Sequence, residues 1–99
     1  MARRKYPEIP SHIRFTAKRD YEVTYIDNFK DDPKQLGECR WNPPQIVVKQ
    51  DQPAGEKVST VIHECIHGLD FELDIKLTET QVLKLERGIF RMLKLNGWI

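Results

Sequence analysis

Two histidines stand four residues apart around a glutamate, in the run His63-Glu64-Cys65-Ile66-His67. Positions i and i+4 of an α-helix project from one face, so both imidazoles can reach a single metal ion. The pattern H-E-x-x-H is typical of zinc hydrolases in which the glutamate acts on a water molecule. The spacing therefore predicts that His63 and His67 bind Zn²⁺ and that Glu64 is the general base.

A catalytic zinc site usually has three protein ligands, so a third residue must join the histidines. Asp70 lies on the same predicted helix face as Ser59 and the two histidines. Glu79 opens a second predicted helix, where the positive end of the helix dipole favours a carboxylate. Glu86 falls in an apolar stripe, where a carboxylate is costly unless it is paired or bound to metal. Each could also serve a different purpose: Asp70 as an acceptor for an imidazole N–H, Glu79 as a helix-start residue, Glu86 as a surface ion-pair partner.

The motif could also occur without a catalytic metal, in two ways. Surface histidines could share this spacing by chance, but two of the three histidines in the chain adopt it with a glutamate in the required place. A structural zinc normally has four protein ligands and usually cysteines. Nothing in the sequence brings Cys39 to the motif, and Cys65 falls on the apolar side of the helix. The two cysteines form no disulfide framework, and reduced thiols are expected.

Apolar residues at helical spacing predict the helix that carries the motif, from about Pro53 to Leu69 or Phe71. Proline suits the first turn of a helix. The predicted stripe lies away from the histidines, so the core-facing and metal-facing surfaces differ. Its members are Val58, Val61, Ile62, Cys65 and Leu69.

A second helix is predicted from a capping box at Thr78 and Gln81 to a stop at Asn96 and Gly97. Trp98 and Ile99 are expected to fold back onto the core. Its apolar stripe comprises Val82, Leu85, Ile89 and Leu93, flanked by Leu83 and Phe90.

The N-terminal half is rich in β-branched and aromatic residues and predicts short strands. Two prolines precede Gln45 to Lys49, which suits an edge strand. Strands are expected at His12 to Ala17, Tyr21 to Ile26, Glu38 to Trp41 and Gln45 to Lys49, with a turn at Lys18 to Asp20 and a loop from Asp27 to Gly37.

These elements predict an α+β fold, in which a small, mainly antiparallel sheet is followed by two packed helices. The 99 residues suffice for a single domain, 1–99. A net charge of +1 argues against a nucleic-acid partner, and the basic cluster Arg3 to Lys5 suits a solvated terminus. No segment predicts a membrane span or a signal peptide, so a cytoplasmic protein is expected.

The runs Ser59 to Asp70 and Leu77 to Val82 resemble the ImmA/IrrE-type metallopeptidases, above all the short, single-domain forms of phage and prophage genomes. The resemblance covers roughly residues 45–98. It implies a zincin-like minimal metallopeptidase and makes His63, His67 and Glu79 the zinc ligands, with Glu64 as the base. The family motif usually has a small residue where this chain has Glu86. Larger members cleave repressors or act in stress regulation, so a regulatory protein is the expected substrate.

The expected reaction is hydrolysis of a peptide bond, with the substrate bound in extended form along the predicted edge strand from Ile46 to Lys49. An oxyanion-stabilising group is also needed, and His12, Tyr25 and Arg40 are candidates. The alternative is a catalytically silent zincin-like module that binds a regulator without cleaving it.

Overall fold

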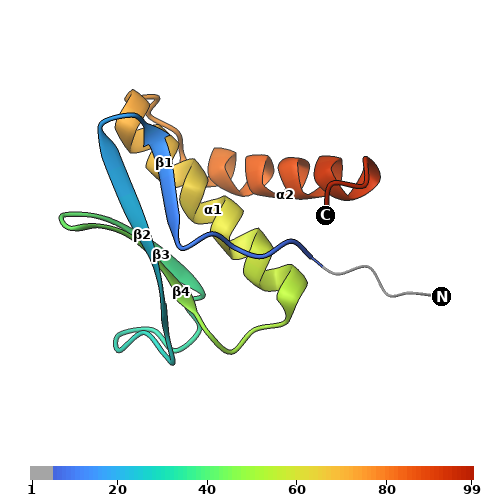
Figure 1. Ribbon diagram of the computed structural model, residues 1–99, viewed down its shortest axis with the longest axis horizontal. Helices are drawn as coiled ribbons and strands as arrows, with labels where there is room; N and C mark the ends of the chain where they lie inside the picture. Colours follow the sequence, from blue (N-terminus) through green and yellow to red (C-terminus); the bar gives the residue numbers. More distant parts are fainter. Residues whose placement is uncertain (1–5) are drawn as a thin grey trace.

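The computed structural model describes residues 6–99 and has four strands followed by two helices, an α+β fold (Figure 1). The basic cluster Arg3 to Lys5 lies outside the described residues. The elements are β1 (His12–Thr16), β2 (Arg19–Ile26), β3 (Gly37–Trp41), β4 (Pro44–Lys49), α1 (Ala54–Leu73) and α2 (Glu79–Leu95).

The strands form one sheet in the order β1-β2-β4-β3. The β1–β2 and β3–β4 pairs are antiparallel, whereas β2 and β4 run parallel, with Tyr25 opposite Val48. The sheet is therefore mainly antiparallel, as predicted.

The prediction that Gln45 to Lys49 forms an edge strand is wrong, because β4 lies between β2 and β3. Ile46, Val47 and Val48 are each at most 1% exposed, as expected for a strand covered on both faces. Pro44 is the first residue of the strand, a position at which proline is tolerated inside a sheet. The edges of the sheet are β1 and β3.

The predicted turn at Lys18 to Asp20 is also wrong in part, because Arg19 and Asp20 belong to β2. Contacts distant in sequence hold Arg19 there: its Nε lies 3.0 Å from Glu72 Oε1 of α1, and its guanidinium stacks over Phe71. Gly37, expected to end a loop, is the first residue of β3.

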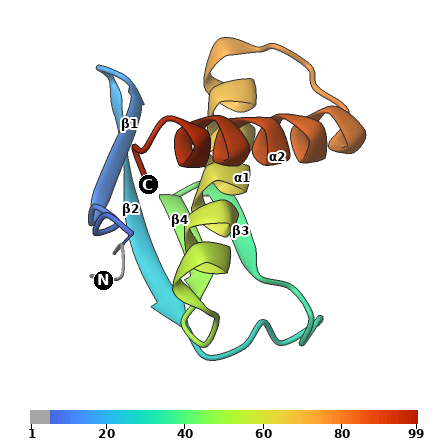
Figure 2. The same cartoon turned by 90° about the vertical axis from the view of Figure 1, so that its right-hand side faces the viewer.

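Helix α1 packs across the sheet and lies between the sheet and α2 (Figures 1 and 2). Pro53 is its N-cap residue, and the helix extends to Leu73, slightly beyond the predicted end. A Cβ atom at Gly68 would lie 2.2 Å from Phe15 Cε2, so glycine permits the close approach to β1. The main core cluster is formed by Tyr21, Val23, Cys39, Ile46, Val48 and Val61, with Cys65 packed against it.

The capping box of α2 is confirmed: Thr78 Oγ1 accepts from the backbone N–H of Gln81, and Gln81 Oε1 accepts from that of Thr78. Asn96 caps the other end and Gly97 follows with φ of 75°. Three predicted core positions are wrong, because Leu69 of α1 is 37%, Leu85 43% and Trp98 73% exposed. Ile99 is buried as expected.

The reason for the error at Leu85 is the orientation of α2 about its axis. Val82 is buried, and Glu86, Ile89, Phe90 and Leu93 are partly buried, so the face turned towards α1 includes Glu86 and excludes Leu85. Neither of the two helices in residues 6–99 has the length and apolar character needed to cross a membrane.

Candidate metal centre

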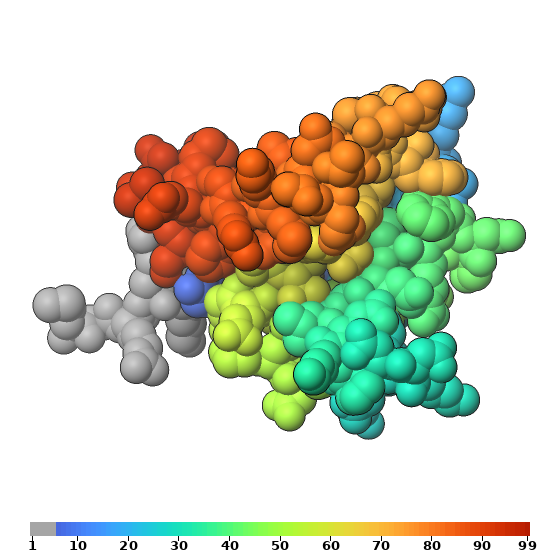
Figure 3. All heavy atoms as spheres, turned by 180° about the vertical axis from the view of Figure 1, so that it is seen from behind, coloured from blue at the N-terminus to red at the C-terminus, as the bar shows by residue number. Residues whose placement is uncertain are grey.

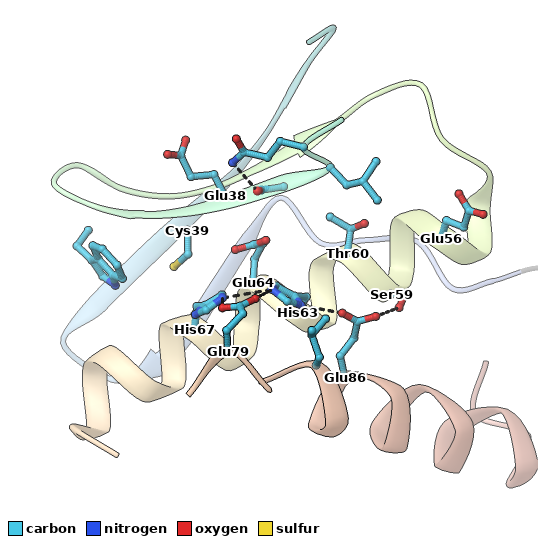
Figure 4. A pocket seen from close by; sticks show the side chains of 15 residues that line it. Glu38, Cys39, Glu56, Ser59, Thr60, His63, Glu64, His67, Glu79 and Glu86 are labelled. Carbon is cyan, nitrogen blue, oxygen red and sulfur yellow. Dashed lines mark hydrogen bonds and ion pairs between the residues drawn. The ribbon is translucent and has the colours of Figure 1, made fainter. Parts of the chain in front are cut away.

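His63 and His67 on α1 meet Glu79 at the first turn of α2 (Figure 4). His63 Nε2 lies 3.1 Å from Glu79 Oε1 and 3.2 Å from His67 Nε2, and His67 Nε2 lies 3.4 Å from Glu79 Oε2. Each residue offers one ligand atom, and these atoms all lie within 4.8 Å of one another. His63, His67 and Glu79 thus form a candidate ligand cluster that could hold a metal ion.

The spacing of these atoms fits a small divalent cation. Ligand atoms bound tetrahedrally to zinc at about 2.0–2.1 Å are roughly 3.3 Å from one another. The two Nε2 atoms are 3.2 Å apart, and the Glu79 carboxylate approaches one through Oε1 at 3.1 Å and the other through Oε2 at 3.4 Å. Two imidazole nitrogens and a carboxylate oxygen suit zinc, although the same ligand set accepts other divalent metals. The Glu79 side chain is 63% exposed, so the cluster opens to solvent and leaves room for water or substrate.

Glu86, the second candidate ligand, lies on the opposite edge of the His63 ring. Its Oε1 is 2.7 Å from His63 Nδ1, and its Oε2 accepts a 2.7 Å hydrogen bond from Ser59 Oγ. The structure therefore brings Glu79, and not Glu86, beside the Nε2 atoms of both histidines.

Asp70, the third candidate, holds the connection between the helices. Its Oδ1 accepts hydrogen bonds from the backbone N–H groups of Lys76, at 2.6 Å, and Leu77, at 3.0 Å. Asp74 and Lys76 adopt positive φ in this connection, with values of 53° and 69°. Asp70 thus fixes the path of the chain from α1 to Glu79 and does not join the ligand cluster.

Glu64 is 6% exposed and lies beneath the start of β3. A Cβ atom at Gly37 would be 3.1 Å from Glu64 Cγ and Oε2, so the strand passes directly over this carboxyl (Figure 4). Burial raises the pKa of Glu64 to about 7, with a smaller opposing contribution from His63 and a further raising contribution from Glu79. A carboxylate with a pKa near neutrality suits a general base.

The cluster lies in a cleft of about 670 Å³ between β3, α1 and α2. In Figure 3 the surface of α1 is visible between α2, in orange, and the green segment that contains β3. Among the described residues, the cleft is lined by five glutamates and by no lysine or arginine: Glu38, Glu56, Glu64, Glu79 and Glu86. Leu36, Trp41 and Leu83 supply its apolar surface.

Neither cysteine joins the ligand cluster. Cys39 lines the cleft but is buried, and burial raises the pKa of its thiol to about 12. Cys65 packs against the core, and burial raises its pKa to about 12 as well. The group of residues that could hold a metal ion includes neither thiol, so the arrangement does not favour a structural zinc site with cysteine ligands.

None of the predicted oxyanion-stabilising residues lines the cleft. His12 pairs with Asp20 at 3.2 Å, and Arg40 pairs with Glu38 at 2.7 Å. Tyr25 contacts the ammonium group of Lys57, in another hollow of the surface. None of the three is therefore placed to stabilise an oxyanion in this cleft.

Two features of the site were missed in the sequence: the close passage of Gly37 and the role of Ser59 as a donor to Glu86. The spacing of Ser59 four residues before His63 was a signal for the second. Comparisons with protein-family models, curated proteins and solved structures found no match to this chain.

Proposed function

We propose that the chain is a zinc-dependent metallopeptidase that hydrolyses a peptide bond in a protein substrate, which the family resemblance suggests is a regulatory protein. His63, His67 and Glu79 bind the metal, and Glu64 is the general base. The observation that carries the proposal is the convergence of two Nε2 atoms and one carboxylate at 3.1 to 3.4 Å, directly beside a buried glutamate.

When bound, zinc would polarise the scissile carbonyl and lower the pKa of water. Glu64 takes a proton from the water molecule whose oxygen attacks the carbonyl carbon. It then transfers that proton to the amide nitrogen as the carbon–nitrogen bond breaks, so that a carboxylic acid and an amine leave. Burial favours this role, because it keeps the pKa of Glu64 close to the pH at which the proton must be exchanged.

The edge of β3 offers a binding position for an extended peptide. Within residues 6–99, the outer backbone edge from Glu38 to Arg40 has no strand partner, and β3 lines the cleft. A peptide added to this edge would form main-chain hydrogen bonds and pass over Glu64. Substrate binding by strand addition is therefore proposed for β3, in place of the Ile46 to Lys49 segment expected from sequence.

The test compares wild-type protein with Glu64→Gln and His63→Ala, each loaded with zinc and incubated with a peptide library. We expect one zinc per chain in the wild type and in Glu64→Gln, and cleavage in the wild type alone. His63→Ala should lose both properties. Equal cleavage by Glu64→Gln would refute the role of the base, and a wild type without metal would refute the proposal as a whole.

A wild-type protein that binds zinc but cleaves no peptide in the library would favour the alternative function, a zincin-like module that binds a regulator without cleaving it. Pull-down of the same protein partner by wild type and by Glu64→Gln, without proteolysis of that partner, would then be the expected result.

A further inference from the structure

Both carboxylate oxygens of Glu86 contact α1. Oε1 is 2.7 Å from His63 Nδ1, and Oε2 accepts from Ser59 Oγ at 2.7 Å (Figure 4). The His63 and Glu86 side chains are 16% and 20% exposed. A largely buried carboxylate on the packed face of a helix is unfavourable unless its oxygens are paired, and here both are.

The relative direction of the helices explains why one imidazole meets two carboxylates. Glu79 and Glu86 are seven residues apart, about 10 Å along α2, and share one face. Glu79 contacts His63 and His67, whereas Glu86 contacts His63 and Ser59. The two helices therefore run in roughly opposite directions where they pack. Glu79 therefore reaches the Nε2 edge of the His63 ring and Glu86 the Nδ1 edge.

We propose that Glu86 is a positioning residue for the metal centre. It accepts a hydrogen bond from Nδ1–H of His63, which fixes the tautomer with a free lone pair on Nε2 and aims that lone pair towards His67 and Glu79. Ser59, by donating to Oε2, fixes the orientation of the Glu86 carboxylate. Carboxylates that hold metal-binding histidines in this way raise metal affinity without being ligands. The inference rests on the proposed function only in assuming that the site holds zinc.

The test measures the dissociation constant for Zn²⁺ by competition with a chromogenic chelator, beside the d–d absorption spectrum of the Co²⁺-loaded protein. Glu86→Gln should bind Zn²⁺ about 10- to 100-fold more weakly than wild type. Its metal stoichiometry and the Co²⁺ spectrum should remain those of a site with an unchanged ligand set. Ser59→Ala should weaken binding in the same direction by a smaller factor.

Glu56→Gln is the matched control, because Glu56 lines the same cleft, as does Glu86, but contacts neither histidine. It removes the same charge from the cleft and should leave the dissociation constant unchanged. Far-ultraviolet circular dichroism checks that each variant is folded. If Glu86→Gln does not fold, Ser59→Ala tests the inference in its place.

Three outcomes would overturn the inference. Unchanged affinity in Glu86→Gln would show that the contact does not position His63. Equal weakening by Glu86→Gln and Glu56→Gln would show a general effect of charge. Loss of bound metal in Glu86→Gln, with metal retained in Glu79→Ala, would make Glu86 a ligand. A wild-type protein that binds no metal would instead refute the proposed function, whatever the variants do.

Discussion

Adjacent residues of α1 occupy opposite environments. His63 faces the cleft and lies between two carboxylates, whereas Glu64 is turned under β3 and is almost fully buried. Burial of an ionisable carboxyl disfavours its charged form, and for Glu64 this effect exceeds the favourable influence of the neighbouring imidazole. The proposed base is therefore held at a cost in stability when no metal is bound.

Glu64→Gln should stabilise the metal-free protein at alkaline pH. The pKa of Glu64 is about 7 in the folded chain against an ordinary value of 4.5. Below pH 4.5 the carboxyl is protonated in both states. As pH rises from 4.5 to 7 the unfolded state loses its proton first, so the folded protein loses stability through this window and does not regain it above.

The expected gain in the variant is on the order of 1–3 kcal/mol at pH 8 and close to zero at pH 4.5. Urea unfolding in the presence of a chelator measures it at both pH values. A gain in stability of equal size at pH 4.5 and pH 8 would contradict an electrostatic origin, because such a gain would come from packing.

Which glutamate reaches which edge of the His63 ring could not be predicted from sequence. Glu79 and Glu86 share one helix face, so periodicity alone cannot separate them. Their roles depend on how far α2 is shifted along α1, a property of packing between elements. The family resemblance favoured Glu79, and the geometry brings Glu79 into the ligand cluster.

At the scale of elements, the helices were predictable and the sheet order was not. The capping box at Thr78 and the stop at Gly97 are local signals, and both ends of α2 fall where they indicate. Strand order is set by pairing between distant segments. The prolines before Gln45 suggested an edge, but burial of Val47 and its neighbours on both faces requires the interior of the sheet.

The capping box positions a proposed ligand, because Glu79 directly follows Thr78. Thr78→Ala should lower the free energy of unfolding by about 1 kcal/mol and should also weaken Zn²⁺ binding, since fraying of the first turn releases Glu79. Chemical denaturation and metal competition measure the two effects. Thr78→Ser retains the hydroxyl group and should restore both. Lower stability with unchanged affinity would show that Glu79 is held by other contacts.

Strand β3 passes so close to α1 that a side chain at Gly37 has no room. The added Cβ of Gly37→Ala would lie 2.6 Å from Thr60 Cγ2, and we expect a loss of about 1–3 kcal/mol in stability. Thr60→Ser removes the clashing methyl group and keeps the hydroxyl group that donates to Gln52 Oε1. The double variant should therefore be more stable than Gly37→Ala alone in thermal unfolding. If the two substitutions destabilise the protein additively, the strain caused by Gly37→Ala does not come from the Thr60 methyl group.

At the scale of the whole molecule, α2 is attached to the rest of the domain through few elements. Among the described elements α2 packs against α1 alone, and its outer surface exposes Leu85, Met92 and Leu95. The proposed ligands come from both helices, so a bound ion would join α2 to the rest of the domain. A metal ion that binds only the folded chain would add its binding free energy to the stability of the domain.

Zinc should accordingly raise the melting temperature. At a free concentration of about 1,000 times the dissociation constant, binding to the folded state alone adds roughly 4 kcal/mol. For a domain of this size, each kcal/mol corresponds to about 4–8 °C. Differential scanning fluorimetry with and without a chelator measures the shift, and His67→Ala should abolish it. An equal shift in His67→Ala would show that zinc acts at another place.

The placement of ligands on either side of the α1–α2 connection has a consequence for the lifetime of the protein in a cell. Without metal, the segment from Asp74 to Thr78 is held chiefly by the Asp70 carboxylate and by local turns, and a protease could cut it once α2 separates from α1. A bound metal ion would tie His67, seven residues before that segment, to Glu79, directly after it. The abundance of the protein would then follow the supply of zinc, because chains that lack the ion would be degraded first.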